Sequence, residues 1–144
     1  MLGEAREITI RGRTLRWTEE GLEYEADERH VEILLEDHNL GPNSKSVVSP
    51  CKSEWEAEAN GEPAPELEEH EKKAFRARAA RGNYLALDRP DLQYSVKEVC
   101  REMACPTKKG EERLKRVARY LVGARKVVWK MRREPEAQGM QVYA

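Results

Sequence analysis

The 144-residue sequence lacks the features that mark secreted, metal-binding or membrane-spanning proteins. Its three cysteines are an odd number and form no Cys-x-x-Cys pair, which argues against a disulfide scaffold and a zinc ribbon. His30, His38 and His70 complete no recognisable set of metal ligands. No apolar run approaches about 18 residues, and no cationic-then-apolar leader opens the chain. We therefore expect an intracellular protein, cytoplasmic or nuclear, with no metal, cofactor or membrane partner.

Patterns of common active sites are also missing. The chain contains no Gly-x-Ser-x-Gly, P-loop or Gly-x-Gly-x-x-Gly sequence. Its carboxylates occur mostly in runs such as EAEANGEPAPELEEHE, which are typical of a solvated surface. His38 falls on an apolar helix face, Cys51 has no base evident nearby, and Tyr94 is a candidate contact residue rather than a nucleophile. We assign no catalytic residue.

Charge is nearly balanced overall, at -1, but it is divided between the two halves of the chain. Residues 1–71 hold 19 acidic and 7 basic side chains, a net charge of -12, and residues 72–144 hold 8 acidic and 19 basic, a net charge of +11. The basic half is suited to a polyanionic partner. An intramolecular interface of opposite charges is the other explanation, and the sequence leaves both open.

Residues 1–26 alternate apolar and polar side chains, as strands do. Ile8 and Ile10 lead to a turn at Arg11-Gly12, and a second turn at TEEG separates two further short runs. The simplest prediction is an N-terminal β-hairpin. The candidate inward-facing residues are Leu15, Trp17, Leu22 and Tyr24.

Residues 27–43 predict a first helix over roughly Glu28–His38, with Asp27 as its N-cap and Gly41-Pro42 beyond its end. Its apolar face consists of Val31, Leu34, Leu35 and His38. Residues 44–65 predict an acidic, flexible connector in which KSVVSPCK is a possible short strand. Trp55 either docks on the core or marks a contact with a partner.

Residues 66–123 predict three more helices, over about 66–87, 91–104 and 108–122. Pro90 and Pro106 lie at the boundaries, where proline is tolerated at a helix start. The apolar stripes of the last two helices are Leu92, Val96, Val99, Cys100 and Met103, and Leu114, Val117, Ala118 and Leu121. Residues 124–144 predict two strands, KVVWKM and a truncated GMQVYA. The expected class is α+β, mainly α, with three to four helices in one bundle.

The last of these helices has a basic surface opposite its apolar stripe. Such a helix packs by one face and offers phosphate contacts with the other. A solvated surface helix, partly neutralised by Glu111 and Glu112, is the alternative. The candidate nucleic-acid-binding residues are Lys108, Lys109, Arg113, Lys115, Arg116 and Arg119.

The stretch NYLALDRPDLQYSVKEVCREMACPTKKGEERLKRVARYLVG resembles the C-terminal part of the reverse transcriptase in copia-type LTR retrotransposon polyproteins. The family has a YLA-x-x-RPD-x-x-Y-x-V step followed by PT and KRVLRYL-x-G. Upstream, VVSPCK resembles the family's PVSTP segment, and DERHVEILLEDHNLG resembles its KYIEKLLEKFGM helix. Within the matching helix, Arg78 and Gly82 depart from the apolar or helix-favouring residues usual there.

This resemblance implies a thumb-like helical region that grips a primer–template, preceded by a hairpin from the end of the palm. The polymerase uses Mg ions held by palm aspartates, and no such pair occurs here. The resemblance places the separate hairpin that carries the catalytic aspartate pair before this chain, and the ribonuclease H domain after it. We therefore expect a fragment that is inactive alone, whose partners are an RNA–DNA hybrid or DNA/RNA primer–template and the rest of the polyprotein.

Two functional hypotheses follow. In the first, the chain contributes primer–template binding, mainly through phosphates and largely independent of base sequence. In the second, it is a non-catalytic interaction module or a degenerate, element-derived reading frame without polymerase-related function. In that case the acidic segment around Trp55 and the basic helices simply neutralise each other.

Overall fold

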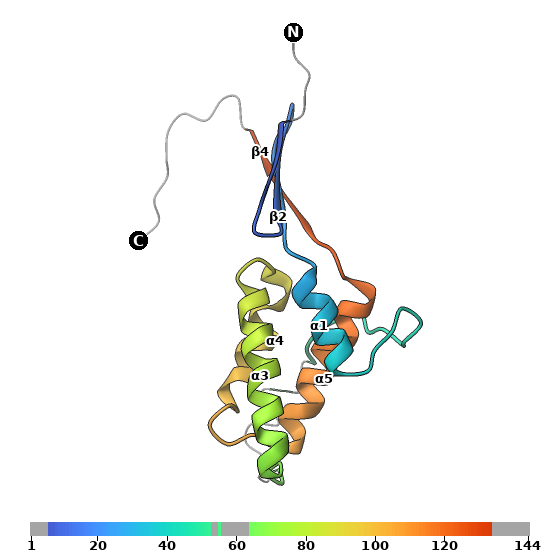
Figure 1. Cartoon of the computed structure of the whole chain (residues 1–144), viewed down its shortest axis with the longest axis vertical. Helices are drawn as coiled ribbons and strands as arrows, with labels where there is room; N and C mark the ends of the chain where they lie inside the picture. Colours follow the sequence, from blue (N-terminus) through green and yellow to red (C-terminus); the bar gives the residue numbers. More distant parts are fainter. Residues whose placement is uncertain (1–5, 53–54, 56–63, 134–144) are drawn as a thin grey trace. The chain divides into compact units, whose positions relative to one another are not determined.

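The protein has an α+β fold, and the computed structural model describes residues 6–52, 55 and 64–133 (Figure 1). An N-terminal three-stranded antiparallel meander is followed by four helices packed together, and a C-terminal strand joins the sheet. The chain forms two compact units, a sheet unit (residues 1–27 and 127–144) and a helical unit (residues 28–126). Within the described residues, no helix has the length and apolar character needed to cross a membrane.

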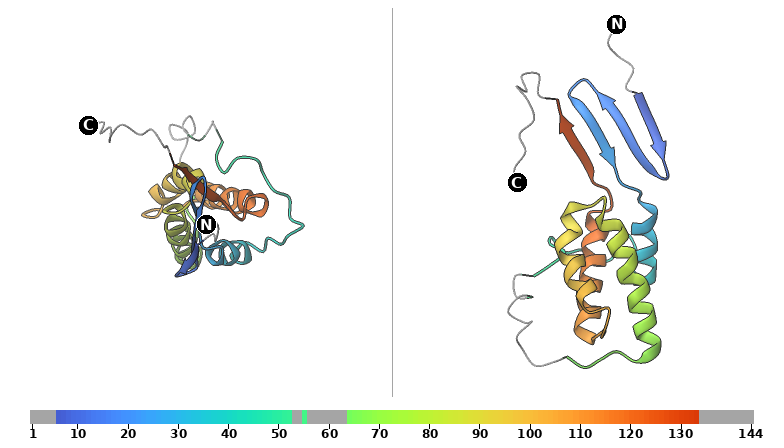
Figure 2. Two further views of the ribbon diagram at one scale, coloured as in Figure 1. Left: turned by 90° about the horizontal axis from the view of Figure 1, so that it is seen from above. Right: turned by 90° about the vertical axis from the view of Figure 1, so that its left-hand side faces the viewer.

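Within residues 6–27 and 127–133, the sheet unit contains four antiparallel strands in the spatial order β1-β2-β3-β4 (Figure 2). The strands are β1 (Arg6–Ile10), β2 (Arg13–Thr18), β3 (Gly21–Glu25) and β4 (Val128–Arg132). The predicted hairpin is therefore part of a larger sheet, in which KVVWKM supplies the fourth strand. The other predicted strand, GMQVYA at 139–144, lies outside the described residues.

The turn between β1 and β2 depends on two residues with left-handed backbone angles. Arg11 has a φ of 50° and Gly12 a φ of 79°, the signature of a two-residue turn that matches the twist of a hairpin. The carboxylate of Asp27 lies where a side chain at Gly12 would project. Asp27 belongs to the sheet unit, and the N-cap of the helix Arg29–Asp37 is Glu28, so the predicted role of Asp27 as that N-cap is wrong.

The strand register separates the sheet into an apolar and a polar face because side chains alternate along each strand. Arg6, Trp17, Leu22 and Met131 form one cross-strand row, and Ile8, Leu15, Tyr24 and Trp129 form the next. With the neighbouring pair Ile10 and Arg13, these residues make up what we call the apolar face. The four predicted inward residues all lie on it, but the prediction that they face inward is wrong for Trp17, which is 48% exposed, while Leu15, Leu22 and Tyr24 are partly buried.

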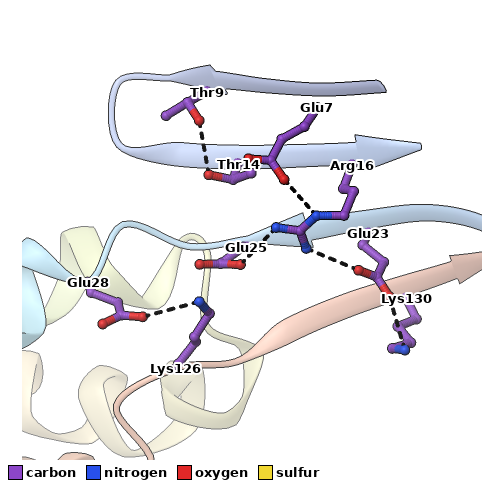
Figure 3. A network of polar contacts seen from close by, with 9 residues as sticks. All are labelled: Glu7, Thr9, Thr14, Arg16, Glu23, Glu25, Glu28, Lys126 and Lys130. Atoms are coloured by element: carbon purple, nitrogen blue, oxygen red, sulfur yellow. Dashed lines mark hydrogen bonds and ion pairs between the residues drawn. The ribbon is translucent and has the colours of Figure 1, made fainter. Parts of the chain in front are cut away.

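The opposite face carries a row of alternating charges that spans all four strands (Figure 3). Arg16 pairs with Glu7 at 2.7 Å on one side and with Glu23 at 3.2 Å on the other. Lys130 completes the row by pairing with Glu23 at 3.0 Å. The hydrogen bond from Lys130, together with a smaller contribution from that of Arg16, holds the pKa of Glu23 below its usual range.

In the described residues the helical unit contains α1 (Arg29–Asp37), α3 (Glu69–Ala86), α4 (Pro90–Arg101) and α5 (Lys108–Gly123). All four were predicted to within three residues at each end. Pro90 is the first residue of α4, as expected from its fixed φ and missing N–H.

The predicted apolar stripes meet in a common core. One cluster brings together α1, α3, α4 and α5 through Leu34, Leu85, Val96 and Leu121, among others. A second cluster surrounds Phe75, Val99 and Leu114. Cys100 and Met103, also predicted as core residues, are partly buried against it.

Arg78 and Gly82, the two departures from the family pattern on α3, have structural partners. Arg78 pairs with Glu111 of α5, with Nη1 at 2.8 Å from Oε1. Gly82 is buried against α4, where Val96 is its nearest neighbour across the interface. Both residues therefore take part in packing α3 against other helices.

The connector contains no strand within residues 44–52, so the possible short strand in KSVVSPCK does not form there. It is linked to α5 instead, through a hydrogen bond from the Val47 N–H to the Arg119 carbonyl at 3.4 Å. Trp55 is buried, with 4% of its surface exposed. Of the two alternatives for Trp55, docking on the helical unit is the one observed.

Candidate nucleic-acid interface

Helix α5 is positioned by its cap and by its apolar stripe. Thr107 is the N-cap, and its Oγ1 accepts a hydrogen bond from the Gly110 N–H at 3.1 Å. Leu114, Val117 and Leu121 are fully buried. Because one side of the helix is committed to the core, its basic side chains project from the other.

A groove of about 360 Å³ runs along this basic side of α5. Residues from α5 and from the connector line it: Lys52, Trp55, Lys109, Glu112, Arg113, Lys115, Arg116 and Arg119. Among the described residues, six basic side chains thus border one concave surface to which one carboxylate, that of Glu112, contributes. Five of the six predicted binding residues line the groove, while Lys108 is exposed outside it.

Arg113 is held at the edge of this groove by three contacts. Its Nη1 donates to Glu102 Oε1 at 2.9 Å, and its Nη2 donates to the Trp55 carbonyl at 3.3 Å. The guanidinium also lies over the Trp55 ring, 5.3 Å from the centroid, in cation–π contact. Only 10% of the Arg113 side chain is exposed. Arg113 therefore joins the connector to α5, a role that its sequence position does not reveal.

The remaining basic residues of the groove differ in how they are held. Arg119 Nε donates to the Lys45 carbonyl at 3.0 Å, which fixes a second point of the connector. Arg116 Nε is buried and has no hydrogen-bond partner in the described part of the chain. Lys115 is exposed. Lys115 is therefore the groove residue of α5 that is most open to an anion, and the partly exposed Arg116 lies beside it in the sequence.

Sequence reasoning missed Lys52 and the wall formed by Trp55. Both residues lie in the connector, more than 50 positions from the α5 residues they meet. The second hypothesis had set the acidic segment around Trp55 against the basic helices, but it did not name Lys52 or the part of α5 that the segment meets.

Arg89, from the RPD motif, lies in a buried polar cluster at the other end of α5. Its side chain is 1% exposed and donates to the carbonyls of Ala124 at 2.8 Å and Arg125 at 3.1 Å. It also pairs with Asp91, and the Tyr120 hydroxyl donates to the same carboxylate at 2.9 Å. Burial favours a higher pKa for Asp91, but the Arg89 guanidinium outweighs this effect and holds that pKa below its usual range. The cluster is structural, because its polar groups are satisfied by one another.

A second buried titratable group, His38, lies near the start of α5. Its Nδ1 donates to the Leu34 carbonyl at 2.9 Å, and its Nε2 lies 3.8 Å from Glu111 Oε1. Burial lowers the pKa of His38. No group of three or more His, Cys, Asp or Glu side chains suited to a metal ion occurs in residues 6–52, 55 and 64–133.

Comparison with protein-family models, with curated proteins and with solved structures finds no match to this chain.

Proposed function

We propose that the helical unit binds the phosphate backbone of a nucleic acid along the basic groove of α5. The observation that carries this proposal is the groove itself, to which the described part of the chain contributes six basic side chains and one carboxylate. Cationic side chains release counterions when they neutralise phosphates, and this release supplies most sequence-independent affinity.

The composition of the groove favours contacts to phosphate over contacts to bases. Trp55 is its only aromatic residue among the eight that line it, and the Arg113 guanidinium lies over its ring. Trp55 therefore lacks the open ring face on which single-strand-binding proteins stack a base. We infer binding that is largely independent of base sequence.

We further propose that the chain is the thumb and connection part of a copia-type reverse transcriptase. Its ligand is then an RNA–DNA hybrid or a DNA/RNA primer–template. The residues that carry the resemblance support this proposal because Arg89, Asp91 and Tyr120 contact one another in one cluster. In this proposal the chain helps to bind the primer–template and catalyses no step, since no catalytic group is assigned to it.

A salt titration of the full chain tests the binding proposal. We expect a labelled RNA–DNA hybrid duplex to bind the chain at about 50 mM salt, with an affinity that falls steeply towards 200 mM. In a plot of log affinity against log salt concentration, each phosphate contact contributes about 0.9 to the slope, which is the value for B-form DNA. The double variant Lys115→Ala, Arg116→Ala removes two charges from the groove and is expected to lower that slope by roughly 2.

The matched control is Lys73→Ala, Lys97→Ala, which removes two exposed charges from α3 and α4 outside the groove. We expect this control to leave the slope nearly unchanged. Equal losses in the two double variants would show non-specific attraction and contradict a site at the groove. Failure of the parent protein to bind at low salt would contradict nucleic-acid binding altogether.

A second candidate, an interaction module without a nucleic-acid ligand, is favoured by the docking of Trp55. Arg113 and Arg119 are both engaged with the connector, through Trp55 and the Lys45 carbonyl. Part of the positive charge of α5 thus serves internal packing. Absence of salt-dependent binding in the titration above would favour this candidate.

A further inference from the structure

Two arginines of the α5 groove are occupied by main-chain carbonyls of the connector. Arg119 Nε donates to the Lys45 carbonyl at 3.0 Å. Arg113 Nη2 donates to the Trp55 carbonyl at 3.3 Å. Each of these carbonyl oxygens accepts a hydrogen bond from a guanidinium that would otherwise donate to a phosphate oxygen. The chain itself therefore engages part of the cationic surface to which a nucleic acid would bind.

These parts of the connector, residues 45–47 and Trp55, are what we call the strap. The Val47 N–H donates to the Arg119 carbonyl at 3.4 Å, so the strap and Arg119 are joined by two hydrogen bonds. Trp55 is buried, and the Arg113 guanidinium lies over its ring. Because its large aromatic side chain buries more apolar surface than the other strap residues can, Trp55 is the main anchor of the strap.

The strap and a phosphate group compete for the same donors. The four strap residues include no acidic side chain, so the acceptors that they offer to the two arginines are neutral carbonyls. A phosphate offers ionised oxygens and accepts two parallel bonds from one guanidinium, which makes the arginine–phosphate contact stronger. Phosphates that reach the groove are therefore expected to displace the strap.

We propose that the strap is an autoinhibitory contact that regulates the α5 groove. With the strap docked, a nucleic acid meets Lys115 and the other groove cations without the full participation of Arg113 and Arg119. Release of the strap adds these two arginines, while Glu102, which lies outside the strap, keeps Arg113 oriented through its bond to Nη1. A ligand whose competent state is only partly populated binds with reduced apparent affinity. This inference rests on the proposed function of the groove as a phosphate-binding site.

Removal of the anchor tests the strap, because Trp55→Ala alters no charge. If Trp55 served only as a wall of the groove, its loss would weaken binding, whereas loss of an autoinhibitory anchor strengthens it. With the labelled RNA–DNA hybrid and the full chain, we expect Trp55→Ala to raise the affinity at about 50 mM salt at least about tenfold. The salt slope is expected to steepen by between about 1 and 2, since two arginines are released and Glu102 offsets part of the charge of one.

The matched control is Trp55→Phe, which retains an aromatic ring for the Arg113 guanidinium to contact. We expect it to stay within about twofold of the parent affinity, because the anchor is kept.

Val47→Pro loosens the strap by a different route, because it removes the backbone N–H that bonds to α5 and leaves every groove side chain unchanged. We expect it to steepen the salt slope by up to about 1, through Arg119. Val47→Ala retains the N–H and is expected to match the parent chain.

Fluorescence of Trp55 reports displacement without any change to the strap. The variant Trp17→Phe, Trp129→Phe leaves Trp55 as the only tryptophan of the chain, and both substitutions lie in the sheet unit. When this variant is saturated with the hybrid, we expect acrylamide quenching of Trp55 to increase several-fold, because a ring that is 4% exposed becomes accessible to solvent. This readout remains decisive where circular dichroism shows that Trp55→Ala does not fold.

The outcomes separate the strap from the groove. Failure of the parent chain to bind the hybrid at low salt would overturn the proposed function and the strap with it. Binding by the parent chain, together with equal or weaker binding by the folded variants Trp55→Ala and Val47→Pro, would overturn the strap alone. Binding that leaves the quenching of Trp55 unchanged would also overturn the strap while the groove stands.

Discussion

Arg89 and Asp91 form a two-bond ion pair at the start of α4. Arg89 Nε donates to Asp91 Oδ1 at 2.9 Å, and Nη2 donates to Oδ2 at 2.7 Å. Pro90 stands between them as the first residue of the helix. Because the same guanidinium also holds the carbonyls that follow α5, the short RPD sequence joins the beginning of one helix to the end of another.

Removal of Arg89 is expected to be strongly destabilising. Arg89→Ala leaves Asp91 and two carbonyls without their buried donor, and loss of one partner of a buried pair costs about 3–5 kcal/mol. Arg89→Lys retains the charge but loses the fork geometry, so an intermediate loss is expected. Urea unfolding monitored by circular dichroism measures both changes. Arg101→Ala is the control, because Arg101 pairs only at the surface with Glu98, and its loss is expected to cost less than about 1 kcal/mol.

Asp91 predicts a loss of stability in acid. Its pKa is depressed in the folded protein, so its contribution is complete above its unfolded value of about 3.9 and is lost as the pH falls through the folded value. The free energy of unfolding of Asp91→Asn is therefore expected to fall less steeply below about pH 4 than that of the parent chain. Tyr120→Phe removes one donor to the carboxylate and is expected to cost about 1 kcal/mol at neutral pH. Identical acid profiles for the parent and Asp91→Asn would refute this assignment.

His38 predicts a second pH dependence, of the same sign and at higher pH. Its pKa is lowered in the folded protein, so the unfolded chain binds the proton more readily. Stability is therefore complete above the unfolded pKa of about 6.5 and declines as the pH falls below it. We expect His38→Gln to remove this decline between about pH 6.5 and 5 in thermal unfolding. His70→Gln, at a site where the side chain is 79% exposed, is expected to keep it.

Gly82 predicts a stabilising substitution. A Cβ at this position would lie 3.6 Å from Val96 Cγ2, an ordinary contact distance, and alanine removes the entropic cost of a glycine within a helix. Gly82→Ala is expected to raise the free energy of unfolding by about 0.5–1 kcal/mol. Gly110→Ala is the contrasting variant, since its Cβ would run into the Glu102 carboxylate. A destabilised Gly82→Ala would show that α3 and α4 approach more closely than this.

Rules that act over a few residues predicted where the helices lie and which side of each is buried. They did not predict contacts between residues far apart in the sequence. The position of Pro90 and the 3.6-residue period predicted the start of α4 and the buried residues Leu92, Val96 and Val99. Asp27 was assigned wrongly because its position before an apolar run fits an N-cap. In the structure its carboxylate lies beside Gly12, a contact between residues 15 positions apart.

The candidate groove was predicted in part. The basic face of α5 follows from helical period alone, and it contains five of the six predicted residues. Lys52 and Trp55 also line the groove because the connector packs against α5. No local sequence pattern predicts that packing. Arg113 illustrates the limit, since it was predicted as a phosphate contact and is held by Glu102 and Trp55.

The sequence by itself determined the elements: the strand alternation, the helix starts and stops, and the apolar side of each helix. These depend on backbone restrictions and side-chain periods that act over a few residues. Only the tertiary structure decided which arginines are buried and which stay open to solvent. Arg89 meets the Ala124 carbonyl across 35 positions, and Arg113 meets the Trp55 carbonyl across 58. Such contacts form only when separate elements pack together, because burial and a distant partner, rather than the residue type, decide the role of each arginine.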